Sequence, residues 1–72
     1  MTSQTYETIG AQARESAAEL LAQGWDPAGD AYDLGTYVGD LQALEERIGR
    51  RATPYERSEL ERMIRDCLTC GR

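Results

Sequence analysis

The sequence predicts an all-α fold, a small antiparallel three-helix bundle spanning residues 1–72, and three observations lead to that prediction. Apolar residues recur at helical spacing in three stretches, at approximately 3–23, 28–48 and 54–70. Glycine, proline and cap-forming side chains separate these stretches. The alternation of apolar and polar residues that is typical of strands is absent. Three helices with short turns pack as a bundle. An alternative is a helical hairpin that completes its core by dimerisation.

The first predicted helix has a clear start and a clear end. Ser3 is a good N-cap. Gly24 suits the left-handed position that often follows a helix, and Trp25 would then fold back on Leu20. These residues predict a Schellman cap at the end of this helix.

The second predicted helix carries the longest apolar stripe in the chain. In heptad spacing this stripe consists of Leu34, Tyr37, Val38, Leu41, Leu44 and Ile48. Asp26 and Pro27 are typical of a cap and a first helical position, so we expect the helix to begin near residue 28. Gly35 and Gly39 lie off the stripe, and each costs about 1 kcal/mol relative to Ala. They indicate either close packing of the first helix or a flat strip that a partner's backbone approaches.

The third predicted helix begins at a capping box. Thr53 is the cap, Pro54 takes the first position, and Glu56 is placed to bond back to the cap. Gly49 ends the helix before it. The predicted core of the whole bundle consists of Leu34, Leu41, Leu44, Ile48, Leu60 and Ile64. A chain of 72 residues is near the size at which one core is marginal, so a homodimer is a further alternative.

Catalysis, metal binding and cofactor binding have little support in the sequence. Histidine and lysine are absent, which removes the commonest general bases. Cys67 and Cys70 form a CxxC pair, but it closes a helix, where the helix dipole disfavours a thiolate. Zinc normally needs four ligands, so only a site shared between two chains stays open. We therefore expect no enzyme activity, no cofactor, no metal and no catalytic residue.

Three sequence features bear on where in the cell the protein acts and on which kind of organism it comes from. No stretch approaches the roughly 20 apolar residues of a membrane span. The N-terminus lacks the basic and apolar segments of a secretion signal, which predicts a cytoplasmic protein. All eight basic residues are arginine, which is typical of GC-rich genomes. We expect a GC-rich bacterium, or a phage or mobile element living in one, as the source.

The charges are distributed unevenly along the chain. Residues 1–46 contain nine acidic residues and one arginine, a net charge of −8, whereas residues 47–72 contain seven arginines and four acidic residues, a net charge of +3. Two interpretations are open. The halves neutralise each other across the fold or between subunits, or an acidic face binds a basic partner.

The basic half suggests a nucleic-acid surface, which its acidic neighbours weaken. The arginines concerned are Arg50, Arg51, Arg57, Arg62 and Arg65. Glu56, Glu59, Glu61 and Asp66 interrupt them, and the chain is acidic as a whole, so attraction to phosphates would be weak. Direct nucleic-acid binding is therefore disfavoured.

The acidic half suggests a protein-binding face. Asp26, Asp33 and Asp40 recur at a spacing of seven, which would place them ~10.5 Å apart along a continuous helix. Tyr32 would lie on the outer side with Trp25 nearby, and aromatic residues beside charge are favoured at interfaces. The predicted partner-binding residues are Trp25, Asp26, Asp30, Tyr32, Asp33, Asp40, Glu45 and Glu46. The alternative is that these acids pair with arginines of the third helix.

The functional hypothesis is a non-enzymatic acidic module that occupies a basic, nucleic-acid-binding surface of a bacterial protein machine. In size and charge the chain is similar to small phage inhibitors such as anti-CRISPR proteins. The alternative is a small dimeric transcriptional regulator or antitoxin that uses the arginine-rich third helix to bind DNA.

Overall fold

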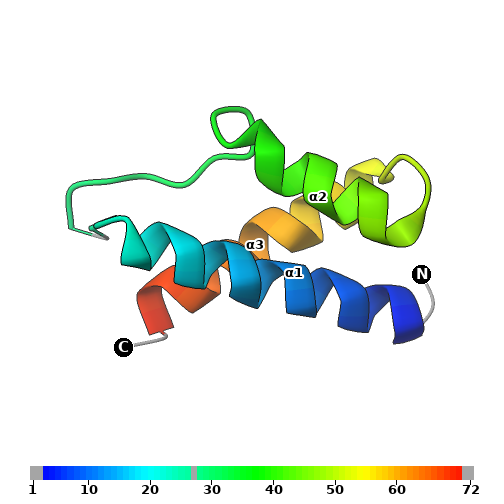
Figure 1. Cartoon of the computed structure of the whole chain (residues 1–72), viewed down its shortest axis with the longest axis horizontal. Helices are drawn as coiled ribbons and strands as arrows, with labels where there is room; N and C mark the ends of the chain where they lie inside the picture. The colour runs from blue at the N-terminus through cyan, green and yellow to red at the C-terminus, as the bar shows by residue number, and fades with distance from the viewer. Residues whose placement is uncertain (1–2, 27, 71–72) are drawn as a thin grey trace.

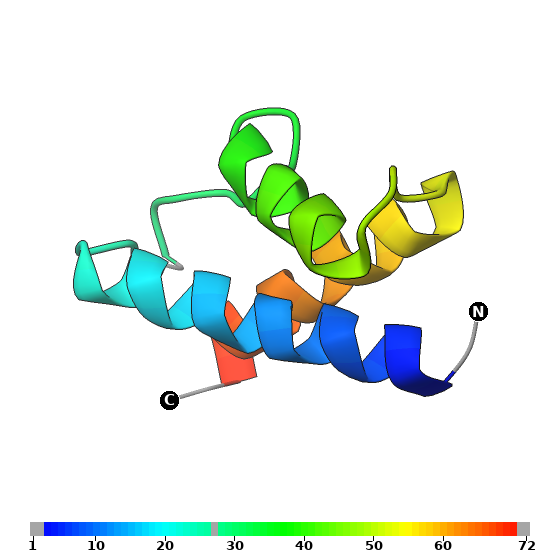
Figure 2. The same ribbon diagram turned by 45° about the vertical axis from the view of Figure 1, so that its right-hand side comes forward.

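Three helices form the described part of the molecule, and their arrangement confirms the predicted fold class. The computed structural model describes residues 3–26 and 28–70. The helices are α1 (Ser3–Ala22), α2 (Val38–Ile48) and α3 (Pro54–Cys70), and no strand occurs in these residues. α1 packs against both α3 and α2. Figure 1 shows α3 crossing behind α1 while α2 lies above α1 in that view, and Figure 2 shows the same arrangement turned. Within the described residues, no helix is long and apolar enough to cross a membrane.

The core lies where the three helices meet. Its buried apolar residues are Ile9, Ala13, Ala17, Tyr32, Leu34, Leu44, Leu60, Ile64 and Leu68. Four of the six predicted core residues are therefore confirmed as buried. The other two, Leu41 and Ile48, are partly buried and pack against the same cluster. Ala13 and Ala17 are small, which lets a neighbouring helix approach α1 closely.

The predicted Schellman cap at the end of α1 is confirmed. Gly24 has a left-handed φ of 95°. The backbone N–H of Trp25 donates to the carbonyl of Leu20 at 3.0 Å, and that of Gly24 donates to Leu21 at 3.1 Å. This pair of bonds satisfies carbonyls that the end of a helix leaves open.

The predicted capping box at the start of α3 is also confirmed. The Thr53 N–H donates to Glu56 Oε1 at 2.8 Å, and the Glu56 N–H donates to Thr53 Oγ1 at 3.2 Å. Arg50 adds two bonds, from Nη1 and Nη2 to the Glu56 carboxylate at 2.8 and 2.7 Å. These donors, with Arg50 first, lower the pKa of the buried Glu56 carboxyl to about 2.

The predicted start of the second helix at residue 28 is wrong. α2 begins only at Val38, and the described residues between Gln23 and Tyr37 form turns and irregular backbone. The proposed role of Pro27 lies outside the described residues. Asp26 Oδ1 accepts the N–H of Ala28 at 3.0 Å. Further along, Asp33 Oδ1 accepts the N–H of Gly35 at 3.1 Å. Such local bonds compete with helix formation, and the glycines weaken it further.

This connection is fixed to the helices by its own side chains and backbone. The N–H of Leu34 donates to Glu61 Oε2 at 3.3 Å, and Arg65 Nε donates to the carbonyl of Tyr32 at 3.2 Å. Leu34 therefore reaches the core from a loop rather than from a helical heptad. Val38, predicted beside the core stripe, is instead 54% exposed at the first position of α2.

Candidate functional site: an acidic groove between α1 and α2

The predicted line of aspartates along one helix edge does not exist in the structure. Only Asp40 lies in a helix, and the expected regular spacing is lost because residues 28–37 are not helical. Asp26 and Asp30 belong to one tight turn, in which the Asp26 N–H donates to Asp30 Oδ2 at 2.8 Å. Their carboxylates remain exposed, but they hold the turn rather than extend a stripe.

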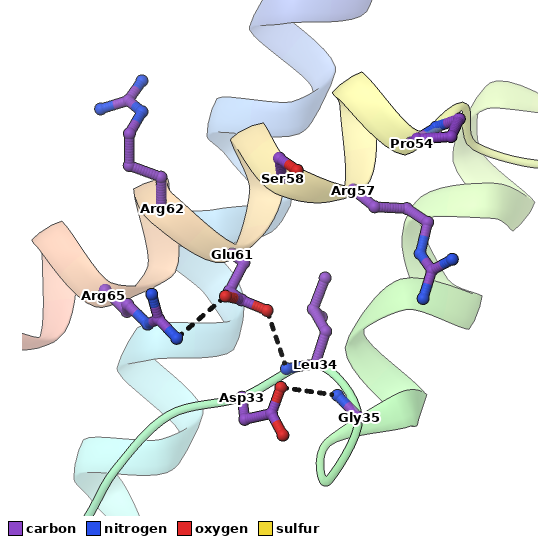
Figure 3. A pocket seen from close by; sticks show the side chains of 9 residues that line it. All are labelled: Asp33, Leu34, Gly35, Pro54, Arg57, Ser58, Glu61, Arg62 and Arg65. Carbon is purple, nitrogen blue, oxygen red and sulfur yellow. Dashed lines mark hydrogen bonds and ion pairs between the residues drawn. The ribbon is translucent and has the colours of Figure 1, made fainter.

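Asp33 is separate from the turn of Asp26 and Asp30 and lines a pocket that also contains arginines. This pocket, of about 580 Å³, lies between the connection and α3 (Figure 3). Glu61 at its centre pairs with Arg65 at 2.9 Å, and Arg62 points away from the other labelled residues. The charges in this pocket are mixed, so it does not continue an acidic surface.

Three other predicted binding residues have internal partners. Tyr32, predicted on the outer side, is 4% exposed; its hydroxyl donates to Asp40 Oδ2 at 2.7 Å and its ring stacks on Tyr37 at 5.1 Å. Burial, with Asp40 second, raises the pKa of Tyr32 above its usual range. Glu45 Oε2 accepts the N–H of Ala52 at 2.9 Å, which fixes the turn between α2 and α3.

Trp25 packs against the core cluster as a half-buried residue. Its indole Nε1–H is buried and finds no acceptor among the described residues. A buried donor without a partner lowers stability. Trp25 therefore contributes through its apolar ring and the backbone bond of the Schellman cap.

The structure does bring two of the predicted residues together with acids of α1. Asp40 and Glu46 of α2 line a groove of about 510 Å³, and Glu15 and Glu19 of α1 line it with them. Its other lining residues are Gln12, Gly39, Ala43 and Arg47. Arg47 pairs with Glu15. The groove thus holds four carboxylates and one arginine.

A smaller pocket of about 190 Å³ shares part of this lining. Glu19, Gly39 and Asp40 belong to both spaces. The remaining lining residues of the small pocket are Ser16, Leu20, Gln23 and Tyr37. An aromatic residue and an aliphatic residue therefore lie beside two carboxylates.

Helical periodicity explains why these residues share one space. On α1 the lining residues Gln12, Glu15, Ser16 and Glu19 follow the i, i+3, i+4, i+7 pattern of a single face. On α2, Asp40, Ala43 and Glu46 recur every three residues. The polar face of α1 is visible in the sequence, but the predicted acidic face comprises only residues of 25–46 and does not include it.

Gly35 and Gly39 turn out to have different explanations. A Cβ atom at Gly35 would meet Asp33 Oδ2 at 3.2 Å, so the turn at Asp33 restricts this position. A Cβ atom at Gly39 would meet nothing within 4 Å. Close packing of the chain on itself therefore does not explain Gly39, which lies open beside the groove.

The acids of α3 differ from those of the groove because arginines neutralise them. Glu59 and Asp66 pair with Arg62 at 2.9 and 3.0 Å, and Glu61 pairs with Arg65. Among the described residues, no ion pair joins Asp26, Asp33 or Asp40 to an arginine. The alternative that third-helix arginines neutralise these aspartates is therefore wrong for the described structure.

The described residues contain no group of three or more histidine, cysteine or acidic residues that could hold a metal ion. Cys67 is half-buried and packs against the core, and it forms no disulfide among these residues. The side chain of Cys70 lies outside what the structure describes. Compared with known protein families, curated proteins and solved structures, the chain matches none.

Proposed function

We propose that this protein is a non-enzymatic binding module whose acidic groove between α1 and α2 docks a basic surface of a protein partner. One observation carries the proposal: four carboxylates from two helices line one groove with a single arginine. Glu19 and Glu46 are exposed and have no ion-pair partner among the described residues. An uncompensated acidic surface attracts basic partners and accelerates their association at low salt.

Binding to DNA through α3 has less support from the structure. The arginines that would contact phosphates are largely occupied, because Arg50 binds Glu56, Arg62 binds Glu59 and Asp66, and Arg65 binds Glu61. Arg51 and Arg57 have no side-chain ion pair in the described structure. Two free arginines on an acidic protein would provide a weak phosphate contact.

A basic nucleic-acid-binding surface is the kind of partner that fits this groove. Surfaces that bind phosphates are rich in arginine and lysine, and an acidic protein competes for them by offering carboxylates in place of phosphates. Small phage inhibitors of the anti-CRISPR class are similar to this chain in size and charge. Occupation of such a surface on a bacterial machine is the inhibitory role that we propose.

Charge reversal within one chain tests the docking site. The probe is a fluorescein-labelled synthetic peptide that contains several arginine and lysine residues. Glu19→Lys and Glu46→Lys should each weaken its binding about tenfold or more, and the affinity of the wild type should fall as salt rises. Glu7→Lys is the matched control, because Glu7 is an exposed acid of α1 outside the groove.

Equal losses in all three variants would mean that the peptide responds to net charge and not to the groove. Absence of binding in the wild type at low salt would also contradict the proposal. Titration of the protein with duplex DNA tests the alternative, DNA binding through α3. Salt-dependent DNA binding that is lost in Arg57→Glu would favour that alternative.

A further inference from the structure

Gln12 is a polar side chain buried beside the groove. It is 5% exposed, and its neighbour Ser16 is 2% exposed. Gln12 Nε2 donates to Ser16 Oγ at 2.9 Å. Gln12 also lines the groove, and its Oε1 accepts no hydrogen bond from the described residues. Among the described residues, the one fully buried side-chain polar atom without a partner is Trp25 Nε1, so Gln12 Oε1 keeps access to the groove and is available to accept a hydrogen bond from a ligand there.

The other polar groups around this oxygen offer mainly acceptors. Ionised carboxylates accept hydrogen bonds and donate none, and the groove has four of them. Its one arginine is already paired with Glu15. A ligand that fits this lining must therefore carry positive charge and several donors, and it needs no acceptor.

We infer that the groove receives an arginine side chain of the basic partner and prefers it to lysine. This inference rests on the proposed function and specifies the group that is recognised. A guanidinium presents five donors in a planar fork, which suits carboxylates on two walls, whereas an ammonium is a compact point charge.

The adjoining small pocket adds a second reason for arginine. Its volume of about 190 Å³ is lined by Tyr37 and Leu20 together with Glu19 and Asp40. A guanidinium stacks on aromatic rings more readily than an ammonium, and its aliphatic stem packs on apolar side chains. The pocket therefore offers both the charge and the apolar contact that an arginine side chain requires.

Two peptides of one sequence, with arginine in the first and lysine at the same positions in the second, test the preference. The wild type should bind the arginine peptide about tenfold more tightly. Gln12→Met keeps the length of the side chain and removes the acceptor, so the ratio of the two affinities should fall toward one while lysine-peptide binding stays unchanged. Gln42→Met is the control, because Gln42 is exposed on α2 and does not line the groove.

Equal affinity of the wild type for both peptides would overturn this inference and leave charge-driven docking intact. Failure of both peptides to bind would overturn both proposals. Should Gln12→Met not fold, the side-chain amide resonance of Gln12 in the wild type gives the answer by NMR. It should shift on addition of the arginine peptide and not of the lysine peptide, and no difference between the two would overturn the preference.

Discussion

Helix α3 and the groove between α1 and α2 are both rich in acids, but only α3 neutralises the charges of its acids with its own arginines. On α3, Glu59, Glu61 and Asp66 each have an arginine within 3.0 Å. In the groove, Arg47 pairs with Glu15, and Glu19 and Glu46 have no such partner among the described residues. The difference indicates that the charges of α3 form ion pairs within the fold, whereas Glu19 and Glu46 of the groove are available to a basic partner.

The salt bridges also show how the acidic and basic halves of the sequence are paired in the fold. One interpretation was that the acidic half and the basic half neutralise each other across the fold. In the described structure, only the pair Glu15–Arg47 joins the two halves as a salt bridge, and the four other salt bridges lie within residues 47–72. The acidic excess of the first half therefore remains on the surface.

The largest change in the free energy of unfolding is expected for the core contact of α2. The groove between α1 and α2 forms only when these two helices pack together. Leu44 is the fully buried residue of α2, so Leu44→Ala should lower the free energy of unfolding by about 2–5 kcal/mol. Val38→Ala, at an exposed position of the same helix, should change it by less than about 0.5 kcal/mol. Urea unfolding measures both, and similar losses in the two variants would contradict the assigned packing of α2.

The ion pair of Glu56 with Arg50, beside the turn between α2 and α3, should make the stability of the protein depend on pH. Glu56→Gln should lower the free energy of unfolding at pH 7 by about 1 kcal/mol, because the capping box is weakened. The pKa of Glu56 is depressed to about 2 in the folded protein, so its stabilising effect is complete above the ordinary pKa of 4.5 and is lost as the pH falls toward 2.

The difference in stability between wild type and Glu56→Gln should therefore shrink between pH 4.5 and pH 2. Thermal unfolding followed by circular dichroism across this range measures it. A difference that stays constant through the range would show that Glu56 does not carry the depressed pKa.

The ends of the helices could be predicted from sequence because their signals are local. Gly24 with Trp25, and Thr53 with Glu56, form bonds over a few residues, and the structure has those bonds. The connection before α2 could not be predicted in the same way. Its heptad spacing agreed with a helix, but the turn at Asp33 and the contacts of Leu34 with α3 compete with that helix.

Only part of the candidate site could be predicted, because the groove depends on the packing of two helices that are distant in the sequence. Asp40 and Glu46 were recognised because they lie in one acidic segment of the sequence. Glu15 and Glu19 were missed because they join the groove through the packing of α1 against α2, which no local spacing reveals. Tyr32 was placed on the wrong side because its position was derived from a helix that does not form there.

A smaller change in stability is expected at Trp25, whose buried indole N–H has no acceptor in the described structure. Trp25→Phe removes the indole N–H that has no acceptor in the described structure and keeps an aromatic ring against the core. The lost contact area and the removed unpaired donor act in opposite directions, so the free energy of unfolding should change by less than about 1 kcal/mol. Chemical unfolding checks this, and a loss of about 3 kcal/mol would indicate that the N–H is bonded in solution.

The most direct test of uncompensated charge in the groove is the sign of the stability change when single acids are neutralised. At low salt, Glu19→Gln and Glu46→Gln should each raise the free energy of unfolding by about 0.2–0.5 kcal/mol, because repulsion within the groove is relieved, and high salt should abolish the gain. Glu61→Gln should lower it by about 1 kcal/mol, because Glu61 binds Arg65 and the Leu34 N–H. Urea unfolding of these three variants at two salt concentrations gives the result. Destabilisation by the two groove substitutions, as by Glu61→Gln, would contradict the claim that the groove holds acids without partners.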